Sequence, residues 1–256
     1  MSAHWLKYAK IIVFFVMAIT GVSVFSSEPI LRIAVASNFL NTATKLVDKY
    51  QPSSIGQVEV ISGSTGKLFA QINRGAPYDI FLAADGLRPE LLFESRAEYG
   101  QLPYVYAVGI LVFWAPGLPA QHEKCNEELL SMPFNHIAIA NTKTAPYGEA
   151  GIRTLQKLGK LQSIQDKLVY GENVAQVLSY LVTGTVDAGF LSLSQVQEQD
   201  YEEATCVWKI PRHYYPELAQ SAIILQPRNT MAQHFMNFLQ SEQARVVIQS
   251  SGYFIP

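Results

Sequence analysis

Four loops in this sequence combine small hydrogen-bonding residues with an almost complete lack of charge. They read Ala-Ser-Asn-Phe at 36–39, Ser-Gly-Ser-Thr-Gly at 62–66, Thr-Ala-Pro-Tyr-Gly at 144–148 and Gly-Glu-Asn-Val at 171–174. Each loop precedes a stretch with the apolar spacing of a helix. The start of a helix exposes unpaired backbone N–H groups and carries about half a positive charge. Hydroxyl and amide side chains add donors, so these loops favour binding of an anion without help from a cation.

Helix capping is the alternative explanation for any one of these loops, because serine, threonine and asparagine cap helices in proteins that bind nothing. The anion hypothesis depends on all four loops meeting at one point. A doubly charged anion taken out of water would then need about six or seven charge-assisted hydrogen bonds to replace its lost hydration.

Residues for catalysis or metal binding do not form a recognisable pattern elsewhere. The five histidines show no metal-ligand spacing, and the loop serines lack the Gly-x-Ser-x-Gly elbow of a hydrolase. The stretch 63–67 has the character of a P-loop but not its full spacing. Capping of the following helix explains Asp85 better than an acid–base pair with Asp79 does. We therefore expect a binding protein and not an enzyme.

The elements that must position these loops alternate between strand and helix in the first part of the chain. Short buried or alternating stretches predict strands at 31–36, 57–62 and 79–83. Apolar residues at helical spacing predict helices at 41–51, 67–74 and 86–96. Alternation of this kind indicates an α/β fold with a mostly parallel sheet.

A second alternating series follows a long apolar strand at 104–115, where we expect the chain to cross from one sheet to another. The series comprises strands at 136–140, 167–170 and 186–191, and helices at 148–158 and 174–183. A break at 211–216 marks the expected return, followed by a strand at 221–225 and a last helix at 230–249. We therefore expect two α/β lobes, residues 27–107 with 214–256 and residues 108–213, with a ligand cleft between the sheet ends.

The N-terminus indicates export. Lys7 and Lys10 precede an uncharged apolar run at 11–19, and small residues lead to Glu28. This pattern predicts a signal peptide over residues 1–26 with cleavage near Ser26, and a membrane anchor is the alternative. The net charge of −2 argues against a nucleic-acid partner. The two cysteines either form one disulfide, which an exported protein allows, or remain two buried thiols.

Longer stretches around these loops resemble a known family. They are ASNF at 36–39, GSTGKLFAQINRGAPYDIFLAAD at 63–85, APYG at 145–148, LQKLG at 155–159, GENV at 171–174 and GFLSLSQV at 189–196. In this order, over nearly all of the mature chain, they resemble the periplasmic molybdate-binding proteins of ABC importers. The second stretch, with its Gly-Ala-Pro-x-Asp-Ile-Phe core, is the most diagnostic.

The resemblance implies a type II periplasmic binding protein fold, whose two lobes close on an oxyanion. Carried over residue by residue, it implies these contacts to the anion: Ser37, Asn38, Ser64, Thr65, Tyr147 and Val174. Either Ser64 or Thr65 makes the hydroxyl contact, whereas Tyr147 and Val174 contribute backbone N–H groups. Ser192 stands where some members of the family place a tyrosine, so the shorter serine is a weaker candidate contact.

The function that this resemblance implies is that of a binding protein for a membrane transporter. The protein would capture molybdate or tungstate in the periplasm and deliver it, as a monomer, to a membrane permease, without any cofactor or direct cation ligand. A ring of neutral donors at one radius can reject the smaller sulfate, since a smaller anion leaves donors unpaired. Two alternatives stay open: an organic anion bound through an arginine such as Arg212, and an exported hydrolase.

Overall fold

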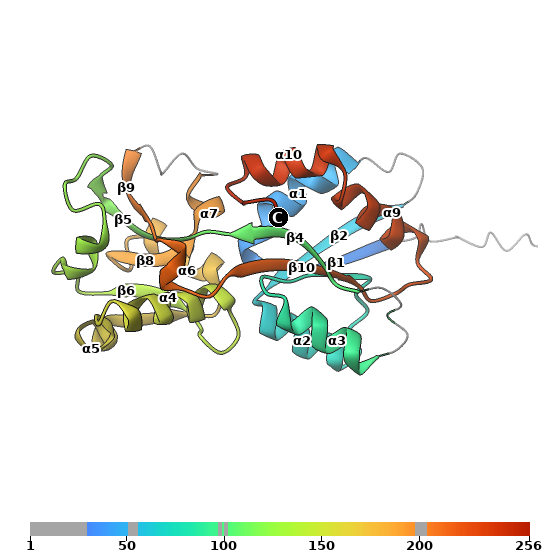
Figure 1. The fold of residues 1–256 in the computed structure, drawn as a ribbon, viewed down its shortest axis with the longest axis horizontal. Coiled ribbons are helices and arrows are strands. Elements are labelled where there is room, and N and C mark those ends of the chain that lie inside the picture. The colour runs from blue at the N-terminus through green and yellow to red at the C-terminus, as the bar shows by residue number, and fades with distance from the viewer. Residues whose placement is uncertain (1–29, 51–55, 97–98, 100–101, 198–203) are drawn as a thin grey trace, which may run out of the picture.

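The computed structural model of the chain describes residues 30–50, 56–96, 99, 102–197 and 204–256. The predicted signal peptide at 1–26 lies outside the described residues. The chain forms two lobes side by side, each a mixed five-stranded sheet with helices on both faces (Figure 1). The predicted two-lobed α/β fold is therefore confirmed. Among the described residues, no helix has both the length and the apolar composition that a membrane span requires.

The first lobe carries a sheet in the order β2-β1-β3-β10-β4. Its strands are β1 (Ile30–Ala36), β2 (Gln57–Gly63), β3 (Ile80–Leu82), β4 (Tyr104–Gly109) and β10 (Leu218–Ile224). Strand β1 runs parallel to β2 and β3, whereas β10 is inserted antiparallel between β3 and β4. Its helices are η1 (Ser37–Phe39), α1 (Leu40–Tyr50), α2 (Thr65–Asn73), α3 (Leu87–Ser95), α9 (Thr230–Leu239) and α10 (Glu242–Ser250). Helices α1, α9 and α10 cover one face of this sheet, and α2 and α3 cover the other (Figure 1).

The second lobe carries a sheet in the order β7-β6-β8-β5-β9. Its strands are β5 (Leu111–Pro119), β6 (Ile137–Ala140), β7 (Leu168–Gly171), β8 (Ala188–Ser192) and β9 (Thr205–Lys209). Its helices are η3 (Glu127–Ser131), α4 (Pro146–Lys157), α5 (Leu161–Ile164), η4 (Gln165–Lys167), α6 (Val174–Val182) and α7 (Leu193–Gln197). A disulfide between Cys125 and Cys206 ties the loop before η3 to β9, with Cα atoms 5.5 Å apart. Of the two cysteine states left open by the sequence, the structure has the disulfide.

The long strand predicted at 104–115 is two strands. Val108 still pairs within the first sheet, with Ala219, whereas Leu111 already pairs with Ser192 of the second sheet. The chain thus leaves one lobe and enters the other within Gly109–Leu111. It returns between β9 and β10 through η5 (Arg212–Tyr214). The uninterrupted apolar sequence hides this break, because both halves are buried, each in a different sheet.

One further expectation was wrong, and one strand was missed. The predicted helix at 230–249 is two helices, because Ser241 caps a new start by accepting a hydrogen bond from the Ala244 N–H at 3.3 Å. Strand β9 was not predicted, although its buried Cys206 and Trp208 alternate with more exposed neighbours as a half-buried strand requires.

Candidate functional site

A small cavity lies between the two lobes, where strands of both sheets end. Ten residues from both lobes surround it closely, so it suits a compact molecule and not an extended one. Its walls are formed by Ala36, Ser37, Asn38, Ser64, Thr65, Ala84, Ala145, Pro146, Tyr147 and Val174. All four predicted loops therefore meet here, and none of the lining side chains is charged.

The first loop places Ser37 and Asn38 in η1, directly after β1. The side-chain amide of Asn38 is already held inside the protein, because its Nδ2 donates to Gln220 Oε1 at 2.9 Å and to the Tyr253 hydroxyl at 3.1 Å. Asn38 is therefore fixed in position. Its backbone N–H, and the N–H and hydroxyl of Ser37, are the groups of this loop suited to a ligand.

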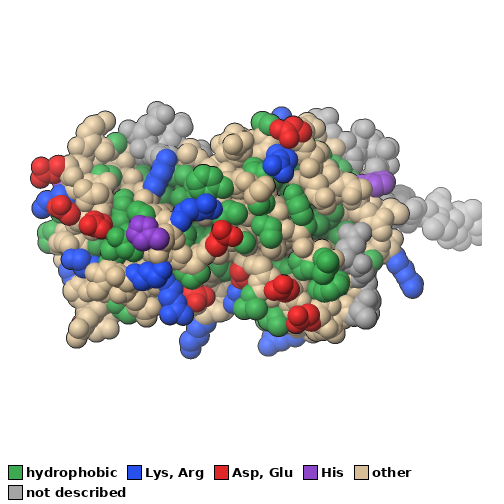
Figure 2. Space-filling model, in the orientation of Figure 1, with side chains coloured by type: hydrophobic (Ala, Val, Ile, Leu, Met, Phe, Trp, Pro, Cys, Tyr) green, Lys and Arg blue, Asp and Glu red, His purple; other side chains and the backbone are tan. Residues whose placement is uncertain are grey.

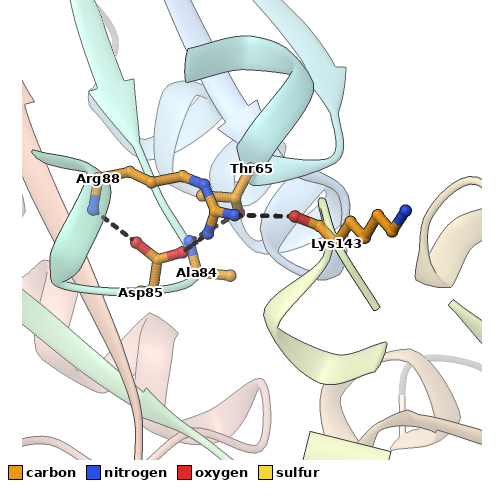
Figure 3. Close-up of polar contacts among 5 residues, drawn as sticks. All are labelled: Thr65, Ala84, Asp85, Arg88 and Lys143. Carbon is orange, nitrogen blue, oxygen red and sulfur yellow. Dashed lines mark hydrogen bonds and ion pairs between the residues drawn. The ribbon is translucent and has the colours of Figure 1, made fainter. Parts of the chain in front are cut away.

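The second loop offers two buried hydroxyls at the start of α2. Ser64 is the N-cap residue but makes no side-chain cap, and its hydroxyl has no hydrogen-bond partner among the described residues. The Thr65 hydroxyl accepts a hydrogen bond from the Ala84 N–H at 3.1 Å, so its own proton remains to be donated (Figure 3). Buried polar groups are normally paired, so the hydroxyl of Ser64 on the cavity wall is suited to a ligand.

The other two loops contribute helix starts from the second lobe. Helix α4 begins with Pro146, a residue well suited to the first helical position because it has no N–H to leave unpaired, and Tyr147 follows. Helix α6 begins at Val174, and the side chain of Asn173 caps the Gln176 N–H at 3.1 Å. The first N–H groups of a helix have no acceptor within the helix. Those of Tyr147 and Val174 are therefore suited to an anion in the cavity.

The side chain of Tyr147 extends from the cavity wall to the point where the chain crosses between the lobes. A methyl group added at Gly109 would lie 2.1 Å from the Tyr147 hydroxyl and 2.9 Å from Gln220 Nε2. Glycine at this crossing therefore makes room for the phenol. Burial, with a further contribution from Tyr253, raises the pKa of Tyr147 well above its usual value, so this side chain stays neutral.

Charged groups do occur in the cleft, but in a second hollow beside the cavity, which we call the outer hollow. Its charged lining residues are Asp85, Arg88, Glu149 and Glu217. The guanidinium of Arg88 forms an ion pair with Asp85, and its Nη2 donates to the Lys143 carbonyl of the second lobe at 3.2 Å (Figure 3).

Two more contacts join the lobes near the second loop. The Gly66 N–H donates to the Thr144 carbonyl at 2.8 Å, and Lys67 Nζ lies 2.6 Å from Glu172 Oε1. The lobes are thus in direct contact around the cavity, in a closed arrangement. On the outer surface, charges of both signs are mixed over both lobes on the face in Figure 2.

The chemistry that this site supports is hydrogen bonding to a compact anion. The lining lacks a histidine, cysteine, carboxylate or amine that would serve as catalyst. In the part of the chain that the structure describes, no group of three or more His, Cys, Asp and Glu side chains is arranged to hold a metal ion.

The structure brings together six of the seven predicted contact residues. Ser192 does not line the cavity, because its hydroxyl lies 2.9 Å from both Ser194 Oγ and Gln195 Oε1. Gln220 and Tyr253, which hydrogen-bond to the side chain of Asn38, were not predicted from the sequence. Gln220 could have been noticed as a glutamine within an apolar strand, whereas nothing around Tyr253 indicates its role.

Three comparisons with known proteins agree with this geometry. Residues 31–254 match the family described as bacterial extracellular solute-binding protein. The molybdate-binding protein ModA of Azotobacter vinelandii is 34% identical over 224 residues, which are 87% of this chain and 88% of that protein. ModA of Rhodobacter capsulatus is 32% identical over 222 residues, 86% of each chain. The solved structure of the Azotobacter vinelandii periplasmic molybdate-binding protein superposes with a TM-score of 0.81 at 33% identity, covering 88% of this chain and 99% of that one.

Proposed function

Because the chain belongs to the bacterial extracellular solute-binding protein family, we propose that it captures molybdate or tungstate between its lobes and delivers the anion to the membrane permease of an ABC transporter. Two relatives above 30% identity, each covering most of the chain, carry molybdate binding in their names. The protein acts as a receptor in this proposal, not as an enzyme, and molybdate is its cargo and not a cofactor.

One observation carries the proposal: the closed cavity is lined from both lobes by neutral hydrogen-bond donors. Taking a divalent oxyanion out of water costs free energy that only a nearly complete set of hydrogen bonds can offset. Helix starts, backbone N–H groups and hydroxyls meet this need, because hydrogen bonds to a charged acceptor are about twice as strong as neutral ones.

We propose that the anion is bound by the hydroxyls of Ser37 and of Ser64 or Thr65, and by the backbone N–H groups of Asn38, Tyr147 and Val174. Ser192 acts in this scheme through its neighbours, and its hydroxyl does not reach the anion. Lobe limits at residues 27–107 with 214–256, and at 108–213, place two of the loops in each lobe, so that closure of the lobes completes the ring of donors.

We also propose that residues 1–26 are an export signal cleaved near Ser26, and that the mature protein works as a monomer in the periplasm. The extracellular family description and the periplasmic relative support export. The disulfide between Cys125 and Cys206 also supports export, because such bonds persist in oxidising compartments.

Isothermal titration of the mature protein with molybdate, tungstate and sulfate tests the proposal. We expect molybdate and tungstate to bind with similar affinity and sulfate to bind at least about 100-fold more weakly, since sulfate leaves donors unpaired. Equal binding of sulfate, or no binding of any of the three anions, would refute the proposed ligand.

A further inference from the structure

The last residues of the chain lie across the hinge between the lobes. Phe254 and Val108 exchange two backbone hydrogen bonds of 2.8 and 2.9 Å, directly before the chain crosses at Gly109. The guanidinium of Arg212, on the return crossing, lies 4.5 Å from the centre of the Phe254 ring. The C-terminal segment is therefore fastened to both connections between the lobes.

Tyr253, within this segment, holds the first anion loop. Its buried hydroxyl donates to the Asn38 carbonyl at 2.7 Å and accepts from Asn38 Nδ2 at 3.1 Å. The hydroxyl of Ser194, in the second lobe, also lies 3.0 Å from the Asn38 carbonyl and 2.9 Å from the Tyr253 hydroxyl. Three segments far apart in the sequence thus meet at the backbone of one residue that lines the cavity.

The same network continues to the opposite side of the cavity. The Ser192 hydroxyl lies 2.9 Å from both Ser194 Oγ and Gln195 Oε1, and the Ser192 backbone N–H donates to Gln195 Oε1 at 3.4 Å. Gln195 Nε2 then donates to the Val174 carbonyl at 3.1 Å. A chain of buried hydrogen bonds therefore joins the backbone of Asn38, in one lobe, to the backbone of Val174, in the other.

We propose that Tyr253 and Ser194 are positioning residues that set the separation between the two halves of the anion site in the closed protein. This inference rests on the proposed function. Neither side chain lines the cavity, so each acts through Asn38 and not by touching the anion. Buried hydrogen-bond networks make the groups that they join rigid. A fixed separation of donors is what allows a larger oxyanion to be told from sulfate.

The test compares Tyr253→Phe, Ser194→Ala and the double variant in the mature protein. Phenylalanine keeps the ring, whose centre lies 5.2 Å from that of Phe39, and removes the hydroxyl alone. Tyr106→Phe is the matched control, because Tyr106 also packs against Phe39, at 4.8 Å, and donates to the Ala83 carbonyl within its own lobe. The measurements are molybdate and sulfate affinities by titration, rate constants by stopped flow, and the melting temperature without ligand.

We expect each single variant to lose about fivefold in molybdate affinity through faster dissociation, because one hydroxyl still holds the Asn38 carbonyl. We expect the double variant to lose about 100-fold in molybdate affinity, which is more than the product of the two single losses. The reason is that the Asn38 carbonyl then has neither the Tyr253 nor the Ser194 hydroxyl as donor. The ratio of molybdate affinity to sulfate affinity should fall in the single variants and fall further in the double variant. Tyr106→Phe should leave this ratio unchanged.

Losses no larger than that of Tyr106→Phe, or lower affinity with an unchanged molybdate-to-sulfate ratio, would overturn the positioning role. If the double variant loses no more affinity than the product of the two single losses, Tyr253 and Ser194 do not act together on Asn38. Failure of the unaltered protein to bind molybdate would instead refute the proposed function, and with it this inference.

Discussion

Two adjoining hollows in the cleft differ in the groups that line them. The cavity between the lobes and the outer hollow share three wall residues, Ala84, Ala145 and Pro146. Beyond these, the cavity is lined by hydroxyls and helix starts. The outer hollow is lined by three carboxylates, those of Asp85, Glu149 and Glu217, and by one guanidinium, that of Arg88. The change from neutral to charged lining thus occurs within one cleft.

The difference shows where charge is useful in this fold. In the outer hollow Arg88 pairs with Asp85 and joins the lobes, and both charged side chains remain partly exposed to solvent. Inside the cavity, a long flexible cation would move inward to follow a smaller anion, and the selection by size would be lost. Neutral dipoles fixed to the backbone cannot follow, so in the proposed function geometry decides which anion fits.

The largest effect should come from placing charge where the cavity has none. In Ser64→Asp, aspartate is a good N-cap, so α2 should form normally. Its buried carboxylate would repel the anion, and we expect a loss of molybdate affinity of at least about 1000-fold by titration. Ser241→Asp makes the same change at the N-cap of α10, away from the cavity, and should bind normally. Binding by Ser64→Asp within tenfold of the unaltered protein would contradict the neutral-cavity interpretation.

The next largest effect should come from keeping the lobes apart. A methyl group at Gly66 would lie 2.8 Å from the Thr144 Cα of the other lobe, where backbone has little freedom to give way. We expect Gly66→Ala to lower molybdate affinity about 100-fold, because the ring of donors does not close. Gly63→Ala, which meets only the Leu68 side chain of its own lobe, is the control. Equal affinities of the two variants would show that contact at Gly66 is not needed for binding.

A single backbone donor can be removed with Val174→Pro. Proline is favoured at the first position of a helix, and the extended Asn173 (φ −153°, ψ 177°) is compatible with a following proline. Loss of one N–H bond to an anion should weaken binding about 30-fold, since such bonds contribute about 2 kcal/mol. Thr230→Pro, at the first position of α9, tests the substitution itself. If Val174→Pro binds as well as Thr230→Pro does, the Val174 N–H does not contact the anion.

Removing charge from the outer hollow should have a much smaller effect. Arg88→Gln breaks the pair with Asp85 and the bond to Lys143, and partly exposed pairs contribute about 1 kcal/mol or less. We therefore expect affinity to fall less than about fivefold in titrations, with an unchanged preference over sulfate. A loss above 50-fold would place this arginine within the anion site and erase the contrast between the hollows.

The smallest effect concerns pH. Burial raises the pKa of Tyr106 and Tyr147 well above the usual 10.0, so both stay protonated when the unfolded chain begins to ionise. Above pH 10 the folded state then binds more protons than the unfolded state, and stability falls as pH rises. The free energy of unfolding, measured with urea, should receive a constant contribution from these two residues between pH 7 and 9. Above pH 10 it should fall. A rise in stability above pH 10 would contradict the neutral, buried phenols.

The sequence predicted the parts of the site that are local. The residues of a loop such as 62–66 indicate by themselves that a helix starts there. Four such loops supply the hydrogen-bond donors of the cavity. What holds Asn38 could not be predicted, because Gln220 and Tyr253 lie 182 and 215 residues further along the chain. The break after Gly109 was also out of reach, since the choice between two sheets depends on strands elsewhere and not on the apolar residues around it.

The position of β10 has a consequence for the order in which the chain folds. The second sheet is built from the continuous stretch β5 to β9, so it can be completed without the C-terminal part of the chain. The first sheet has to wait, because β10 fills the place between β3 and β4. Until it arrives, both strands keep unpaired edges of the kind that invite aggregation. A chain that emerges N-terminus first should therefore complete the second lobe before the first lobe. It is most prone to aggregation between these two steps.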